Sequence, residues 1–275
     1  MEQYLKINDT RIHIECTGKG ETVLLLAGLG SLSPITEFRP LVEQLKDSCR
    51  VVVLEYAGYG QSDDASSPRT IEHITEEIHE VMRQLGEQRY TLIAHSLAGI
   101  YGLHYVNRFR EEVKAFIGID ISVPQQFSGE LARQEANSIL QAQQENLHNE
   151  SEEFYKETQE AAIAFLAGQT TYPYSSEDLA HYARMAWRAA HRTTVIDEIR
   201  HLDENAKKVA PLRFPKECRT LLLLSAENIK RLPEWEQWHR ELIDDSSLAE
   251  IITGDHYLHL QSTETVANRI REFLK

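Results

Sequence analysis

The chain has 275 residues, of which 41% are hydrophobic and 26% are charged. This apolar content is enough to bury a core, so the composition excludes a disordered chain. The 43 acidic residues outnumber the 29 lysines and arginines, which gives a formal net charge of −14. Because an anionic surface repels a polyanion and the basic residues are scattered, we expect no nucleic-acid partner.

The three cysteines are far apart in the sequence, at Cys16, Cys49 and Cys218. None forms a C-x-x-C pair or has a metal-like spacing to a histidine, so we expect reduced thiols, no metal site and a cytoplasmic protein. The first 15 residues are charged and strand-like, and no apolar run approaches the roughly 18 residues that span a bilayer. We therefore expect no signal peptide and no membrane partner.

The first elements along the chain form a predicted β-hairpin. Polar and apolar residues alternate over 4–7 and 11–15, around Asn8-Asp9. Continuous apolar runs then follow, each typical of a strand that is buried on both faces. These runs cover residues 23–27, 50–54, 90–94, 115–119, 221–224 and 249–252.

Helical patterns lie between these strands. The clearest covers 71–85, where apolar residues recur on one face before Gly86. Further helices are predicted over 41–45, 97–106 and 265–274. Buried strands that alternate with helices indicate an α/β fold, with a mostly parallel, doubly wound sheet covered on both faces.

Residues 124–215 interrupt this alternation. The stretch has no convincing strand, is rich in Gln, Glu and Ala, and has helical patterns at 131–147, 153–166 and 177–190. We interpret it as a helical cap inserted before the last two strands. The core domain would then consist of residues 1–123 and 216–275.

Ser96 is the first candidate for chemistry. The predicted strand 90–94 runs directly into Ala94-His95-Ser96-Leu97-Ala98-Gly99, and a predicted helix follows. A sharp turn from strand to helix strains the backbone, so a serine at its apex needs small neighbours. The same turn brings backbone N–H groups of a helix N-terminus close to the serine. This pattern favours a nucleophilic serine over one that merely begins a helix.

Here the chain resembles the α/β-hydrolase fold superfamily, nearly from end to end. In order, the matching segments resemble the oxyanion loop, the glycine-rich turn after the next strand, the nucleophile elbow and the histidine loop. These segments are residues 24–30, 55–63, 94–99 and 254–260. The chain departs from common members in having Ala27 before Gly28 in place of His-Gly, and Ala94 and Ala98 in place of glycines.

His256 is the candidate base that would activate the serine hydroxyl. It lies in a short loop between the last predicted strand and the C-terminal helix, where the superfamily has its histidine. His259 is the obvious rival, and we interpret it as structural. His95 is next to the nucleophile in sequence, and we expect its side chain to point away from that of Ser96.

Two carboxylates remain open as the group that orients His256. Relatives usually have the acid in the loop that here follows strand 221–224. Aligning Leu232-Pro233 with the usual Val-Pro puts Ile229 at the acid position, so Glu227, two residues earlier, would have to reach with its longer side chain. The alternative is Asp120 after strand 115–119, which resembles the acid of relatives such as the haloalkane dehalogenases. Either choice gives the order Ser, acid, His.

The resemblance implies an oxyanion hole formed by the backbone N–H groups of Leu29 and Leu97. It implies a serine hydrolase that needs no cofactor and cleaves a carboxylic ester or related acyl bond of a small organic molecule through an acyl-enzyme. Dehalogenase and epoxide hydrolase relatives use an aspartate nucleophile, which Ser96 disfavours, whereas peptidase, lipase, C–C hydrolase and thioesterase activities stay open. Because the acid is uncertain, the alternative is a hydrolase-fold protein that binds or senses a small ligand with little turnover.

Overall fold

A single eight-stranded sheet forms the centre of the computed structural model, which describes residues 2–275 apart from the side chain of Leu131. The strand order is β1-β2-β4-β3-β5-β6-β7-β8. The bounds are β1 (Glu2–Ile7), β2 (Thr10–Gly18), β3 (Glu21–Leu26), β4 (Cys49–Glu55), β5 (Tyr90–His95), β6 (Val113–Ile119), β7 (Arg219–Ser225) and β8 (Leu248–Ile252). β1 and β2 pair antiparallel, as do β2 and β4, and all pairings from β4 to β8 are parallel. The predicted mostly parallel sheet is confirmed.

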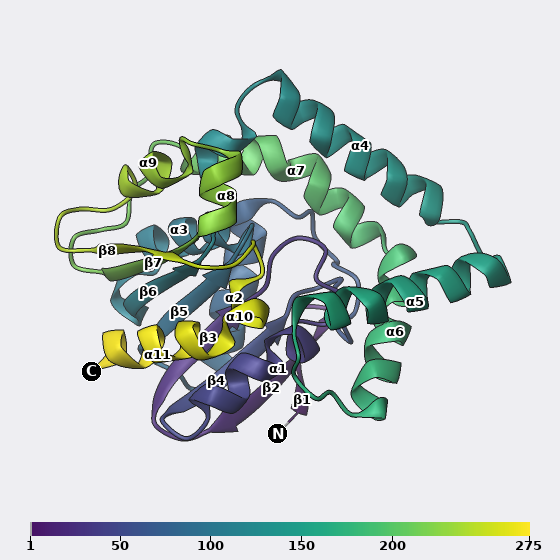
Figure 1. The fold of residues 1–275 in the computed structure, drawn as a ribbon, viewed down its shortest axis with the longest axis horizontal. Helices are drawn as coiled ribbons and strands as arrows, with labels where there is room; N and C mark the ends of the chain where they lie inside the picture. Colours follow the sequence, from purple (N-terminus) through teal and green to yellow (C-terminus); the bar gives the residue numbers. More distant parts are fainter. Residues whose placement is uncertain (1) are drawn as a thin grey trace.

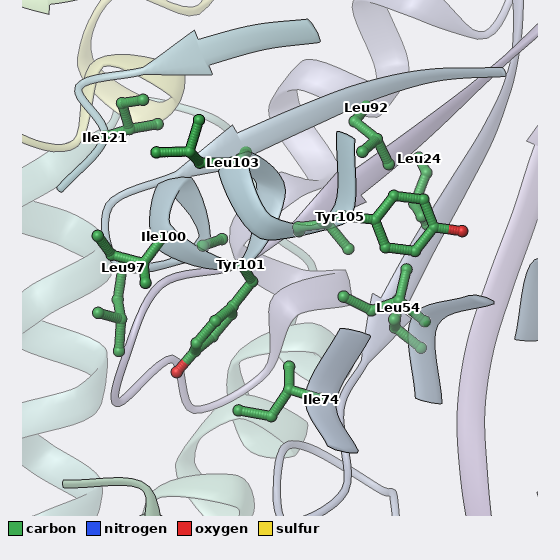
Figure 2. Close-up of a cluster of buried hydrophobic side chains, with 14 of the residues drawn as sticks. Leu24, Leu54, Ile74, Leu92, Leu97, Ile100, Tyr101, Leu103, Tyr105 and Ile121 are labelled. Atoms are coloured by element: carbon green, nitrogen blue, oxygen red, sulfur yellow. The ribbon is translucent and has the colours of Figure 1, made fainter. Parts of the chain in front are cut away.

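Helices cover both faces of this sheet. On one face, α1 (Pro34–Leu45) and α11 (Thr263–Leu274) bury apolar side chains against alternate strand residues such as Val23 and Leu25. On the other face, α2 (Ile71–Gln84) and α3 (Ala98–Arg108) pack on the intervening residues. Figure 2 shows this second cluster, in which the labelled side chains include Leu24, Leu54, Ile74, Leu92 and Tyr105.

Helix α1 is longer than the predicted 41–45. Ser33 is its N-cap, with a side chain that accepts a hydrogen bond from the Thr36 N–H, and Pro34 occupies the first turn. The N–H that proline lacks would have no partner in the first turn of a helix. Pro34 is therefore compatible with a helix start. The start of α1 therefore lies seven residues earlier than predicted, close to the loop that follows β3.

A helical insert lies between β6 and β7, as predicted. It begins with a short 3₁₀ turn at Pro124–Phe127. Its helices are α4 (Glu130–Asn146), α5 (Glu152–Gln169), α6 (Ser176–Ala190) and α7 (Thr193–Val209). Figure 1 shows them in teal and green on one side of the molecule, away from α11. The sequence predicted only three; α7 was missed because its β-branched start, Thr193 to Ile196, has low helix propensity.

The insert is tied to the core by buried polar side chains of α7. The carboxylate of Glu198 is buried and accepts hydrogen bonds from the hydroxyls of Tyr59, at 2.8 Å, and Tyr101. Asn205 accepts the N–H of Ile71 at 2.8 Å and donates to the carbonyl of Arg69 at 3.0 Å. Buried polar groups are expensive to leave unpaired, so these contacts hold the insert at a defined position.

Short helices occupy the loops near the C-terminus: α8 (Ala226–Arg231), α9 (Trp235–Arg240) and α10 (Leu258–Gln261). Between residues 2 and 275, no helix combines the length and apolarity needed to cross a bilayer.

Candidate active site

Ser96 lies at the tip of a sharp turn between β5 and α3. Its φ angle is +55°, a left-handed conformation that non-glycine residues rarely adopt. A Cβ atom on Gly28 would lie 2.5 Å from the Ser96 Cβ, and one on Gly99 would lie 2.4 Å from the Ile121 Cβ. The loop after β3 therefore approaches the serine, and the start of α3 approaches the segment after β6, as closely as glycine allows. Such strain is typical of functional sites.

A cavity of about 230 Å³ opens in front of Ser96. The loop Gly28 to Leu32 lines one wall, and the insert contributes Phe165 from α5 and Tyr182 from α6. Tyr257 of the histidine loop also lines the cavity. The cavity thus lies between core and insert, and its walls combine two serines, Ser31 and Ser96, with several aromatic rings.

His256 and Asp120 are 136 residues apart in the sequence but form a hydrogen bond in the fold. The Nδ1–H of His256 donates to Asp120 Oδ2 at 2.7 Å. Asp120 follows β6, is fully buried, and has a φ of +44°. Its carboxylate also accepts the Ser225 N–H at 2.8 Å and the Trp235 Nε1–H at 2.9 Å. A carboxylate held by several donors fixes the imidazole so that Nε2 can accept a proton.

Glu227 does not reach the histidine. Its carboxylate lies 2.6 Å from the ammonium of Lys230, on the exposed side of α8. The side chain of the next residue, Asn228, turns inward instead and donates to Asp120 Oδ2. This arrangement follows from Ser225, whose Oγ accepts the Asn228 N–H and caps α8. Of the two candidate acids, the structure brings only Asp120 to His256.

His95 and His259 form a buried cluster with His256. His95 Nε2–H donates to the His256 carbonyl oxygen at 3.1 Å, and the two rings are 4.7 Å apart. The expected direction of the His95 side chain, away from that of Ser96, stays a prediction; the residue lines the same cavity as Ser96, and its ring lies against those of His256 and His259. Burial lowers the pKa of His95 well below its usual value and lowers the pKa of His259 to about 3, so both rings are neutral at neutral pH.

Glu37 of α1 is a cavity residue that the sequence analysis missed. Its buried carboxylate accepts hydrogen bonds from Ser31 Oγ at 2.7 Å, from the Leu32 N–H at 2.9 Å and from the Tyr182 hydroxyl at 2.9 Å. Burial raises the pKa of Glu37. Glu37 therefore connects the loop after β3 with the insert. The only sequence signal was an acid in the first turn of a helix.

The two residues predicted to donate to an oxyanion lie in the loop after β3 and directly after the serine. Leu29 follows Gly28 and lines the cavity, and Leu97 follows Ser96 at the N-cap of α3. In the described part of the chain, no group of three or more His, Cys, Asp and Glu side chains could hold a metal ion.

Residues 21–199 match the family model described as alpha/beta hydrolase fold. The uncharacterized protein YbdG of Bacillus subtilis is 29% identical over 117 residues, which are 42% of this chain and 36% of that protein. A cis-3-alkyl-4-alkyloxetan-2-one decarboxylase of Shewanella oneidensis is 28% identical over 118 residues, with the same two shares. The chain thus spans about a third of the length of these relatives.

Among solved structures, an epoxide hydrolase from Vigna radiata has a TM-score of 0.75 at 19% identity, covering 100% of this chain and 97% of that one. At this identity the likeness concerns the fold alone. The family model, in contrast, covers more than half of the sequence, including the turn at Ser96 and the strand end at Asp120. The chain therefore belongs to the alpha/beta hydrolase fold family.

Proposed function

We propose that the protein is a serine hydrolase that cleaves a carboxylic ester of a small organic molecule. The observation that carries this proposal is the Asp120–His256 hydrogen bond of 2.7 Å, together with the strained Ser96 that faces a cavity. An imidazole oriented by a buried carboxylate is the arrangement that activates a serine hydroxyl.

In the proposed reaction, Ser96 Oγ attacks the ester carbonyl carbon while His256 Nε2 takes the hydroxyl proton. The N–H groups of Leu29 and Leu97 stabilise the resulting oxyanion. The tetrahedral intermediate then collapses, the leaving alcohol takes its proton from His256, and an acyl-enzyme remains on Ser96. Water attacks this ester with His256 again as base, which releases the acid and restores the serine.

The serine is also the reason to favour an ester over an epoxide, although one structural neighbour is an epoxide hydrolase. A serine that opened an epoxide would form an ether, and an ether has no carbonyl carbon for water to attack. A serine that attacks an ester forms another ester, which water can cleave. The nucleophile at position 96 therefore fits acyl transfer.

The test is hydrolysis of p-nitrophenyl acetate, together with labelling by a fluorophosphonate probe. We expect Ser96→Ala to lower kcat by about 10⁴-fold or more and to abolish labelling. Ser138→Ala, which removes an exposed hydroxyl on α4, serves as the matched control and should change neither readout. Activity that survives Ser96→Ala would refute the mechanism. A wild-type protein that neither reacts with the probe nor turns over esters would favour a ligand-binding role.

A further inference from the structure

A second cavity, of about 330 Å³, lies beneath the helical insert. It is lined by residues of α4, α5, α6 and the start of α7, is open to solvent on one side, and reaches the loop after β3. Gly30, Ser31, Leu32 and Phe165 line both this cavity and the one in front of Ser96. The two cavities therefore adjoin at the oxyanion loop, with Phe165 at the boundary.

The walls of the second cavity are uncharged and mostly apolar, with Ser31, Gln143, Asn146 and Thr158 as their polar residues. Methyl groups of α5 and α6 dominate them, from Ala162, Ala186, Ala189 and Ala190, together with Val195 of α7. No Lys, Arg, Asp or Glu is among the described residues that line it. Such a space favours an alkyl chain, because each buried methylene contributes about 0.8 kcal/mol and a charge would lose its hydration.

The position of the second cavity indicates which half of an ester would enter it. His256 must donate a proton to the leaving alcohol, so the alcohol lies on the side of the histidine loop. No described residue of 253–260 lines the second cavity, whereas Gly30 to Leu32 of the oxyanion loop do. The acyl chain is the half that points away from His256 and toward the insert.

We infer that the second cavity is an acyl-chain subsite, and that the enzyme prefers esters of neutral, unbranched, medium-length carboxylic acids. This inference rests on the proposed function. An acyl chain that ends in a carboxylate is disfavoured for two reasons. No Lys or Arg among the described residues lines either cavity, and the buried carboxylate of Glu37 lines the first one.

The experiment compares kcat/KM for p-nitrophenyl acetate and hexanoate, and for the p-nitrophenyl half-ester of adipic acid, whose six-carbon acyl chain ends in a carboxylate. Four fully buried methylenes would raise kcat/KM about 200-fold. We expect a gain of at least tenfold from acetate to hexanoate in the wild type, and a loss of this gain with the half-ester.

Two variants on α5 test the location. Ala161 lines the second cavity and is exposed enough to accept a larger side chain, whereas Ala164, also exposed, lines neither of these cavities. Ala161→Phe should lower kcat/KM for the hexanoate ester about tenfold and keep kcat/KM for the acetate ester within twofold of the wild type. Ala164→Phe should leave kcat/KM for both esters unchanged. Thr158→Phe fills the same cavity from one turn earlier and should repeat the effect if Ala161→Phe does not fold.

Equal kcat/KM for acetate and hexanoate in the wild type would overturn the inference, as would equal losses on both esters in Ala161→Phe and Thr158→Phe. A preference for the adipate half-ester would overturn the stated charge preference. Failure of the proposed function looks different, because acetate itself would not be hydrolysed and Ser96 would not be labelled.

Discussion

The loops at the strand ends and the helical insert contribute to the site in different ways. The loops hold Ser96 and Asp120 in left-handed backbone conformations, and they pair the Asp120 carboxylate with donors from three other segments. The insert adds cavity walls, through Phe165 and Tyr182, and no group that bonds to the serine or histidine among the contacts described. Under the proposed function, the reaction would depend on the core and the choice of substrate on the insert.

The two regions also differ in how they are held. The core sheet is secured by continuous backbone pairing and two apolar clusters. The insert joins one of these clusters through apolar side chains of α7, such as Ile199 and Leu202, and adds buried polar contacts of Glu198, Asn205 and Tyr182. Single substitutions can therefore separate the two regions experimentally.

The largest expected effect is on the core chemistry. Asp120→Asn should lower kcat for p-nitrophenyl acetate by about 10³- to 10⁴-fold, because an amide stabilises neither the required tautomer nor the imidazolium cation. Glu227→Gln is the control and should stay within twofold, since its carboxylate pairs with Lys230. Steady-state kinetics on folded variants measure both. A large loss in Glu227→Gln with a small one in Asp120→Asn would reverse the assignment.

The next effect concerns the attachment of the insert. Glu198→Ala should reduce the free energy of unfolding by about 3 kcal/mol, because it removes the acceptor for two buried tyrosine hydroxyls and a charge near buried Arg69. Glu204→Ala on the same helix removes only an exposed ion pair with Lys208 and should cost less than about 0.5 kcal/mol. Urea denaturation compares them, and equal losses would contradict the role of Glu198.

A third prediction uses the buried histidine cluster and pH. In the folded protein the pKa of His259 is about 3, whereas an unfolded histidine has a pKa near 6.5. The unfolded chain therefore takes up a proton first as the pH falls, so this group lowers stability between about pH 6.5 and pH 3. At pH 4.5 the free energy of unfolding is therefore about 2–3 kcal/mol lower than at pH 7.5 because of this group.

The measurement compares the pH dependence of unfolding in the wild type and in His259→Gln, which cannot titrate. The wild type should lose about 2–3 kcal/mol relative to the variant over this range, whereas His148→Gln, at an exposed position on the insert, should follow the wild type. A constant difference across pH would show that His259 is not held neutral.

The smallest effect concerns the contact between the insert and α1. Tyr182→Phe removes the hydroxyl that donates to Glu37 at 2.9 Å and should cost about 1 kcal/mol of stability. Tyr155→Phe, at an exposed position on α5, is the control and should be neutral. Thermal unfolding distinguishes the two, and identical melting temperatures for all three proteins would show that the insert does not depend on this bond.

The sequence by itself determined the α/β architecture, the insert before the last two strands, and the turn that presents Ser96. These features are local: doubly buried strands are continuous apolar runs, and a strained turn requires small residues next to it. His256 could likewise be named as the candidate base from its place between the last strand and the final helix. The catalytic roles of both residues remain predictions.

The tertiary structure alone decided which carboxylate meets the histidine. Asp120 and His256 are brought together because β6, β7 and β8 are neighbours, and the cap of α8 turns Glu227 outward and Asn228 inward. The role of Glu37 and the cavity under the insert were hidden for the same reason. Each depends on segments far apart in the sequence, and a contact between such segments leaves no periodic pattern in either one.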